Sequence, residues 1–249
     1  MFGVMMERVA VLSDIHGVLP ALEAVLAEPD VRDAERIVLT GDIAAGPLPV
    51  ETLDLLTSLG DRAVWVSGNG DRALVEDNGD SRFVSAWAAQ QLRPEQVALL
   101  SSLPATAELA IAGLGRVLFC HATPRDDEEI VLVDSRAERW AEVLEGVRDD
   151  ITTIVCGHTH MPYVRLVHGR MVVNPGSVGM PYGLPGAHWV LLGPGITLRR
   201  TPIALEPACT RLATESAFPG AAEWANEYLR RTASAEKAIE VFGPGDGRG

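Results

Sequence analysis

The first strand-like run of the chain ends directly in two side chains that can bind a metal. Residues 9–12 are consecutive apolar residues, and Asp14 and His16 come just after them. Because the run is short and bounded by serine and glycine, it predicts a strand covered on both faces, although periodicity alone does not distinguish it from a buried helix. Residues 19–26 follow with helical spacing and a proline in the first turn. This order of strand, polar turn and helix is typical of an α/β unit.

The same arrangement, an apolar strand that ends in His, Asp or Asn, returns four more times along the chain. The runs at 36–39 and 63–66 each precede a helical segment, as the first run does. Three such units in a row predict parallel strands with right-handed crossovers, whose carboxyl ends lie at one edge of the sheet. The polar residues at the five strand ends are Asp14, His16, Asp42, Asn69, His121, His158 and His160.

The rest of the chain predicts a single domain over residues 1–242. We expect a helical insertion at about 78–103, made of two surface helices, and a C-terminal helix at about 221–241. Residues 107–120 have the pattern of a hairpin, and the stretch from 163 to 202 reads as antiparallel strands. Residues 243–249 are rich in glycine and predict a flexible tail.

Composition and charge limit the classes of partner. The formal net charge is -13, and without a basic stripe this argues against an extended nucleic-acid surface. A small anionic substrate would need local cations, for which metal ions are the obvious source. Three cysteines without framework spacing indicate a reducing compartment, so we expect a cytoplasmic protein. No apolar run reaches the roughly 18 residues of a membrane span, and the sequence says nothing about oligomeric state.

The seven polar residues at the strand ends are informative only together. Alone, Asp42 could cap a helix, Asn69 could occupy a left-handed turn, and a single histidine is more often structural than a ligand. Gathered at converging strand ends without a cation, they would leave several buried polar groups unpaired. Seven donors also exceed the needs of one tetrahedral site. We therefore expect two metals that share a bridging carboxylate.

These motifs resemble those of the calcineurin-like metallophosphoesterases, in particular the small bacterial members. The family pattern D-x-H, G-D, G-N-H-[DE], H and G-H-x-H is matched in order over about residues 9–180. The matching segments are Asp14-Ile15-His16, Gly41-Asp42, Gly68-Asn69-Gly70-Asp71, His121 and Gly157-His158-Thr159-His160. The resemblance implies an α/β fold, a four-layer α/β/β/α sandwich of two mixed β-sheets flanked by helices.

The resemblance also implies the ligands of each metal. Asp14, His16 and His160 would hold one ion, Asn69, His121 and His158 the other, and Asp42 would bridge them. The implied function is a dinuclear metal-dependent phosphoesterase that hydrolyses phosphodiesters or phosphomonoesters by attack of a metal-bridging hydroxide. Mn²⁺ is the cofactor we favour, and Fe, Zn, Co and Ni suit the same ligands.

Gly70 departs from the family pattern, because relatives with histidine there use it at the transition state or the leaving group. Its absence is the one argument for the alternative, a non-catalytic metal-binding scaffold or regulatory protein of the same fold. Glycine at this position could serve a positive φ. Asp71 normally pairs with that histidine; here it is a candidate catalytic residue or the N-cap of a helix from Arg72.

Other polar side chains are weaker candidates. Asn69 and Arg72 could bind the substrate phosphate, and Arg125 could do the same, but solvated surface arginines are common. His168 and His188 match no motif, so we expect structural roles for them. The cysteines beside the proposed ligands, at 120 and 156, are expected to pack rather than to bind zinc.

Overall fold

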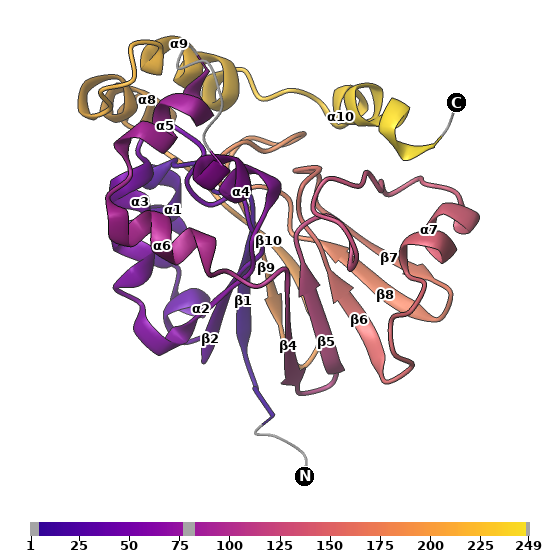
Figure 1. The fold of residues 1–249 in the computed structure, drawn as a ribbon. Helices are drawn as coiled ribbons and strands as arrows, with labels where there is room; N and C mark the ends of the chain where they lie inside the picture. Colours follow the sequence, from indigo (N-terminus) through magenta and orange to yellow (C-terminus); the bar gives the residue numbers. More distant parts are fainter. Residues whose placement is uncertain (1–4, 77–82, 248–249) are drawn as a thin grey trace.

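The computed structural model describes residues 5–76 and 83–247, and these form two five-stranded sheets with helices on their outer sides (Figure 1). The first sheet has the order β10, β9, β1, β2, β3, and the second β4, β5, β6, β8, β7. The strands are β1 (Val9–Leu12), β2 (Arg36–Leu39), β3 (Ala63–Trp65), β4 (Thr106–Ile111), β5 (Gly115–Cys120), β6 (Ile151–Val155), β7 (Tyr163–Val167), β8 (Arg170–Asn174), β9 (Ala187–Leu192) and β10 (Ile196–Thr201). The predicted fold class is confirmed.

Strand pairing places the predicted units where the sequence suggested. β1, β2 and β3 pair in parallel, so the turns after them open at one edge of the first sheet. In the second sheet β6 lies between β5 and β8 and is parallel to both. The hairpin of β4 and β5 is antiparallel, as are the pairs β7 with β8 and β9 with β10. Both sheets are therefore mixed.

Alternating side chains of β1 explain why the sheets stack. Val9 and Val11 pack between the two sheets, whereas Ala10 and Leu12 pack under the helices of the first sheet. Successive residues of a strand point to opposite faces, so a strand covered on both sides is apolar throughout. On the far side of the second sheet, Trp140 of α7 (Ala137–Val143) covers the outer face. Four layers result.

Helices of the first half follow the strands that the sequence paired with them. They are α1 (Leu19–Leu26), α2 (Pro29–Arg32), α3 (Pro49–Thr57) and α4 (Asn69–Glu76). The expected pair of surface helices within 78–103 is present as α5 (Val84–Gln91) and α6 (Pro94–Ser101), while positions 77–82 lie outside the described residues. These helices leave the carboxyl ends of β1, β2 and β3 open.

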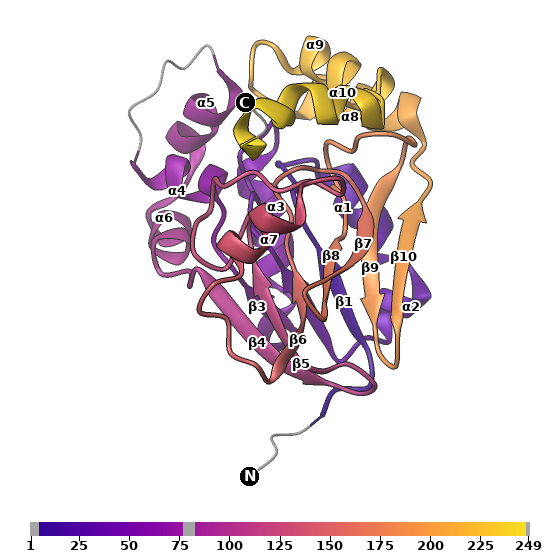
Figure 2. The same ribbon diagram turned by 90° about the vertical axis from the view of Figure 1, so that its right-hand side faces the viewer.

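The C-terminal region differs from the single helix predicted over 221–241. After α8 (Leu205–Glu215), the chain forms α9 (Ala221–Ala225), a π-helical turn (Asn226–Arg230) and a separate helix, α10 (Ala235–Phe242). The second helix starts anew because the Ser234 side chain accepts the backbone N–H of Lys237 as an N-cap. Figure 2 shows these helices lying across the top of the sandwich.

The segment after α10 was predicted to be a flexible tail, but its first part is folded. Gly243–Asp246 form a 3-10 turn, and Asp246 is buried where its carboxylate accepts a hydrogen bond from the Ser135 hydroxyl. This contact ties the end of the chain to the loop before α7. Residues 248–249 lie outside the described part.

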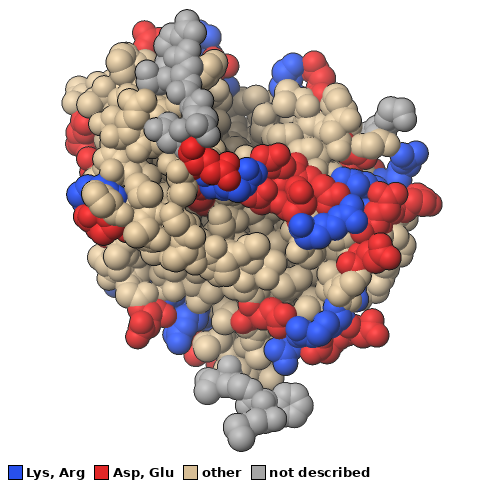
Figure 3. All heavy atoms as spheres, in the orientation of Figure 1, with Lys and Arg blue, Asp and Glu red and all other residues tan. Residues whose placement is uncertain are grey.

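The surface shows no sign of a polyanion-binding face on the side drawn in Figure 3. Acidic and basic side chains lie interspersed in a band below a hollow at the top of the molecule. Among the described residues, no helix has the length and hydrophobicity that crossing a bilayer requires.

Candidate metal centre

The two sheets bring the predicted ligands together at one end of the sandwich. Asp14 and His16 follow β1, Asp42 follows β2, and Asn69 begins α4 directly after β3. From the second sheet, His121 follows β5, and His158 and His160 follow β6. Both aspartates, His121 and His160 are buried. Two groups of these side chains lie close enough together to hold ions.

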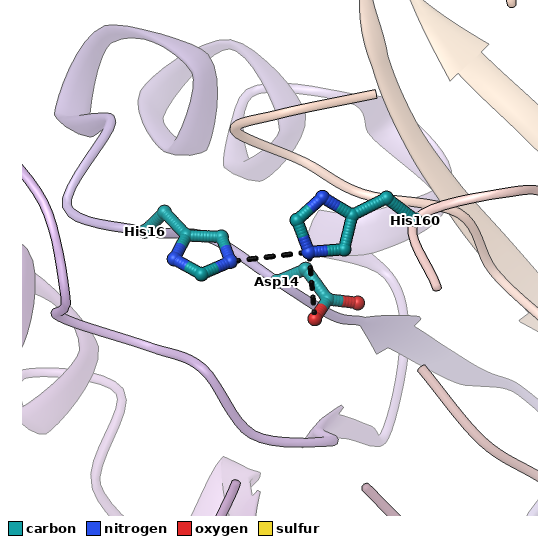
Figure 4. Close-up of side chains that lie close together, drawn as sticks. All are labelled: Asp14, His16 and His160. Carbon is teal, nitrogen blue, oxygen red and sulfur yellow. Dashed lines mark hydrogen bonds and ion pairs between the residues drawn. The ribbon is translucent and has the colours of Figure 1, made fainter. Parts of the chain in front are cut away.

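The first group consists of Asp14, His16 and His160, drawn in Figure 4. The Nε2 atoms of His16 and His160 lie 3.2 Å apart. His160 Nε2 is 3.3 Å from Asp14 Oδ1, and His16 Nε2 is 3.6 Å from Oδ2 of Asp42. Three side chains from both sheets therefore point their donor atoms at one spot, and the Asp42 carboxylate borders it.

The second group consists of Asp14, Asp42 and His121, so Asp14 belongs to both groups. Oδ1 of Asp42 is 3.4 Å from His121 Nε2, and that nitrogen is 3.0 Å from Asn69 Oδ1. The rings of His121 and His158 lie edge to face, with centroids 5.1 Å apart. One donor atom each of Asp14, Asp42 and His121 fall within 4.8 Å of one another. Asp42 thus lies between His16 and His121, with one carboxylate oxygen toward each.

Backbone carbonyls decide which nitrogen each imidazole presents to the centre. Nδ1 of His16 is 3.2 Å from the Ala45 carbonyl, Nδ1 of His121 is 2.7 Å from that of Thr40, and Nδ1 of His160 is 2.8 Å from that of Met180. A carbonyl accepts only, so each Nδ1 carries the hydrogen, and in a neutral ring the lone pair is on Nε2.

This arrangement fits divalent cations. The Nε2 lone pairs of His16 and His160 face each other, and that of His121 faces an amide oxygen and a carboxylate oxygen. None of these partners can donate a hydrogen to a neutral imidazole. Such a buried set of acceptors is unfavourable unless a proton or a metal ion lies between them. Imidazoles, carboxylates and an amide are the ligands that divalent transition metals take in proteins.

Burial and charge shift the pKa values of the four histidines in two directions. Burial lowers the pKa of His16, and burial together with the nearby His121 lowers that of His158 to about 4. Burial is also the largest single influence on His121 and His160 and opposes their charged forms, but the nearby carboxylates of Asp14 and Asp42 and the hydrogen bonds of the two rings together outweigh it, so both pKa values are raised. The two carboxylates therefore attract positive charge at the places where ions would bind.

Protons should compete with metal ions at this centre. Ligand imidazoles bind metal only when neutral, and the raised pKa values of His121 and His160 keep protons on them to higher pH than on free histidine. We expect the gain in melting temperature on adding Mn²⁺ to shrink as pH falls from about 8 to about 5.

The stability of the metal-free fold should change less over the same range, because its histidines act in opposite directions. His16 and His158 have lowered pKa values in the folded chain. As pH falls through about 6.5, these two histidines take up protons in the unfolded chain but not in the folded one, so they lower the free energy of unfolding. His121 and His160 have raised pKa values, so their protonated forms add stability at low pH.

Calorimetric scans with Mn²⁺ and with EDTA at several pH values separate the metal-dependent change from the metal-free one. The difference between the two melting temperatures at each pH isolates the contribution of the ions. A melting temperature that is indifferent to both reagents, after the chelator is shown to strip any metal, would contradict a preformed site.

Five of the seven predicted ligands adopt a left-handed backbone conformation. The φ angles are 54° for Asp14, 49° for His16, 53° for Asp42, 66° for His158 and 55° for His160. This conformation is unfavourable for residues with a side chain and concentrates at functional sites. It turns the chain sharply after each strand, so that consecutive donors point back into the centre. No local sequence pattern predicts this left-handed conformation.

Gly70 has a steric role that differs from the expected positive φ. Its φ is not among the left-handed ones of the described glycines. Instead, its N–H donates to Asp42 Oδ1 at 2.6 Å, and an added Cβ would lie 2.8 Å from that oxygen. Gly68 is equally close to Asp42, with a Cβ position 2.4 Å from Oδ1. In this structure the backbone at both glycines packs directly against the Asp42 carboxylate, so a side chain at either position would require that carboxylate to shift.

Asp71 is neither an N-cap nor exposed to the centre. α4 begins at Asn69, and the buried Asp71 carboxylate accepts the N–H of Ile43 at 2.8 Å and of Gly68 at 3.0 Å. Burial first, and then the charge of Asp42, raises its pKa to about 7. Asp71 therefore joins the loop after Asp42 to the loop before Asn69. This positioning contact is between distant segments, and sequence reasoning missed it.

The arginines considered for phosphate binding are held by acidic partners. Arg72 contacts Asp127 at 2.9 Å and Glu128 at 2.7 Å, and Arg125 contacts Glu129 at 2.6 Å. These contacts lie beside His121, along a pocket that Arg72 and Arg125 help to line.

The remaining histidines and the cysteines have structural surroundings. Nε2 of His168 is 2.7 Å from the Ala137 carbonyl, and Nε2 of His188 is 2.8 Å from that of Leu184. All three cysteines are free and buried, and burial raises the pKa of each thiol.

The comparison with protein families decides what kind of centre this is. The model of the calcineurin-like phosphoesterase superfamily domain matches residues 6–192. The chain belongs to this superfamily. The matched region runs from β1 to the end of β9, so it contains every residue of the candidate metal centre described above.

Individual relatives agree with this assignment. An uncharacterized protein of Methanocaldococcus jannaschii is 30% identical over 201 residues, which cover 70% of this chain and 77% of that protein. The crystal structure of a metallophosphoesterase from Sphaerobacter thermophilus is 28% identical, with a TM-score of 0.70 over 90% of this chain and 98% of that one. A hypothetical protein from Pyrococcus horikoshii shares the fold, with a TM-score of 0.73, 18% identity and coverage of 91% and 99%.

Proposed function

We propose that this calcineurin-like protein is a phosphoesterase that works with two divalent ions. The observation that carries the proposal is the set of Nε2 atoms on His16, His121 and His160. Each is fixed by a carbonyl on the far side of its ring and faces an acceptor across the centre. Asp14, His16 and His160 would hold one ion, and Asn69, His121 and His158 the other.

Asp42 would serve both ions. Its Oδ2 faces His16 and its Oδ1 faces His121, so each oxygen belongs to one group of donors. A shared carboxylate screens the repulsion between two nearby cations. When bound, the ions would activate water and neutralise charge on the phosphoryl oxygens. Mn²⁺ is the ion we favour, and Fe, Zn, Co or Ni suit the same donors.

Asn69 has a chemical reason to be an amide. Its Oδ1 lies next to His121 Nε2 and can bind an ion without adding negative charge near Asp42. Its NH₂ group is a donor and can orient a phosphoryl oxygen of the substrate. Arg72 is held by Asp127 and Glu128, so its guanidinium would have to leave these carboxylates before it could bind the substrate phosphate.

Hydrolysis after metal reconstitution tests the proposal. The protein is stripped with EDTA, dialysed, and assayed against a panel of phosphomonoesters and phosphodiesters with and without Mn²⁺. We expect turnover only with added metal, and a much lower rate for Asp42→Asn. Two bound ions without hydrolysis of any ester would favour the alternative, a metal-binding scaffold or regulatory protein.

The missing histidine at Gly70 predicts how the rate depends on the leaving group. A positioned general acid contributes about 10²- to 10⁴-fold in many enzymes. Both oxygens of Asp71 accept backbone N–H groups, which hold this carboxyl between two loops rather than leaving it free to follow a leaving group. We expect activated aryl esters to be cleaved well and alkyl esters poorly.

A series of aryl and alkyl esters measures this dependence. The logarithm of kcat/KM is plotted against the pKa of the leaving alcohol at saturating Mn²⁺. A steep negative slope is the expected result. A shallow slope would show that another group donates the proton, and His16 would be the first residue to replace.

A further inference from the structure

A pocket with aromatic walls opens beside the metal centre, on the side of His160. It has a volume of about 380 Å³, and its lining includes His160, Tyr182, Tyr228 and Phe242. The ring of Tyr182 lies 6.2 Å from that of His160 and 6.0 Å from that of Phe242. Phe242 also lies 6.1 Å from His158, so aromatic rings border both metal-binding groups.

Part of the wall of this pocket comes from a segment of the chain outside the family match. The match ends at residue 192, whereas Tyr228 and Phe242 belong to the C-terminal segment. Figure 1 shows the chain crossing from the helices over the first sheet to α10, which lies at the end of the second sheet. Ala238 of α10 packs with Leu132 and Met161, which anchors the helix over the second sheet.

The pocket is attached rigidly to the centre. Met180 accepts the Nδ1–H of His160, and two residues on, the Tyr182 N–H is 3.3 Å from the His160 carbonyl. The next residue, Gly183, donates to the Ala233 carbonyl at 2.8 Å. The loop that carries Tyr182 is thus joined to His160 on one side and to the start of α10 on the other.

Charged side chains that line the pocket can hydrogen-bond to polar atoms at the edge of an aromatic ring. Arg231 and Glu227 are exposed and line the pocket, offering N–H donors and carboxylate acceptors. Lys237 also lines it, with its ammonium 2.9 Å from Glu240. A pocket of this volume, mostly apolar with a few polar groups, is typical of a small-molecule site.

The pocket on the opposite side of the centre has a different character. It has a volume of about 350 Å³ and is lined by His121, Thr123, Asp126 and both Arg72 and Arg125. No Phe, Tyr or Trp is among the described residues that line it, and its arginines contact acidic side chains. Of these two pockets, the one with aromatic walls is therefore the one that favours an apolar planar group.

We propose that the pocket formed by Tyr182, Tyr228 and Phe242 binds the organic group of the substrate, and that this group is a planar heteroaromatic ring, as in a nucleotide. The inference rests on the phosphoesterase activity proposed above. A ring stacks on aromatic side chains without regard to its substituents, while Arg231 and Glu227 hydrogen-bond to its edge. The phosphate then reaches the ions beside His160.

Esters that differ only in the base test the proposal. Adenosine 5′-monophosphate is compared with ribose 5-phosphate, and the methyl diester of each is included so that a diesterase is also assayed. With Mn²⁺ present, we expect KM to be about 10-fold or more lower for the base-bearing ester of each pair. Tyr182→Leu and Phe242→Leu should each raise that KM about 5-fold or more and leave the base-free ester unchanged.

Binding is measured alongside turnover. Calorimetric titration of the Mn²⁺-loaded protein with adenosine 5′-monophosphate and with ribose 5-phosphate should show the same preference. Phe83→Leu is the matched control, since Phe83 is exposed and lines a different pocket. Metal content and melting temperature of each variant check that the centre and the fold are intact.

The outcomes separate this inference from the proposed function. Equal affinity for base-bearing and base-free compounds, or equal weakening of both by Tyr182→Leu with two metals retained, would overturn the pocket assignment. Hydrolysis that does not depend on the base would support the proposed phosphoesterase and contradict the pocket assignment. Base-dependent binding that Tyr182→Leu abolishes, without hydrolysis of any ester, supports the pocket and contradicts the enzyme.

Discussion

Asp42→Ala is expected to remove both metal binding and hydrolysis. Each oxygen of this carboxylate faces a different group of donors, at 3.6 Å from His16 and 3.4 Å from His121. Without it, two cations would repel each other at short range with no shared anion between them. We expect fewer than two metals per chain and a loss of at least about 1,000-fold in kcat/KM, equivalent to several kcal/mol of transition-state stabilisation.

Metal analysis of the dialysed variant and its rate on an aryl phosphodiester are the two measurements. His168→Ala is the matched control and should behave like the wild type, because the Nε2 of this histidine bonds to the exposed Ala137 carbonyl and not to the candidate ligands. A variant at Asp42 that keeps two metals per chain and full turnover would show that the carboxylate does not bridge.

Gly70→His is expected to damage the centre rather than to restore a general acid. Any Cβ at position 70 would lie 2.8 Å from Asp42 Oδ1 and 3.0 Å from its Cγ. The carboxylate cannot move aside without leaving His121, so we expect a loss of metal affinity of roughly 10- to 100-fold, the size seen when groups supporting metal ligands are replaced. Gly70→Ala should cause most of the same loss, because the clash arises at Cβ.

Competition with a metal-sensing dye measures the affinity of each variant, and melting temperature reports on folding. Gly195→Ala is the control, since a Cβ there would meet nothing within 4 Å. If Gly70→His binds two metals as tightly as the wild type and cleaves alkyl esters faster, the close approach to Asp42 is not limiting and histidine can act at this position.

The strand-end pattern carried the prediction of a donor cluster and of the class of fold. A short apolar run followed by a polar turn is a local feature, and parallel strands bring such turns to one edge without further information. Asp14 and Asp42 could therefore be grouped from the order of the chain alone, whereas His121 follows a strand of the other sheet and joins them through the stacking of the two sheets. The helix over 221–241 was predicted less well, because the N-cap at Ser234 and the π-helical turn before it interrupt an otherwise helical composition.

Contacts between distant segments decided the rest. The carbonyls of Ala45, Thr40 and Met180 set which imidazole nitrogen faces the ions, and a backbone carbonyl has no sequence signature. The sequence suggests that Asp71 caps a helix. Its actual hydrogen-bond partners, such as the Ile43 N–H, come next to it only when β2 packs against β3, and no local pattern indicates them.

Gly70 and Phe242 show the same difference between what the sequence determines and what only folding determines. The sequence alone determined that position 70 lacks a side chain and that seven donors follow strands. Only the tertiary structure decided that Gly70 faces Asp42 and that Phe242, far along the chain, borders the same centre. The physical reason is that residue type and local periodicity are written in the order of the chain. Steric fit, hydrogen-bond partners and pocket walls arise between residues that become neighbours only on folding.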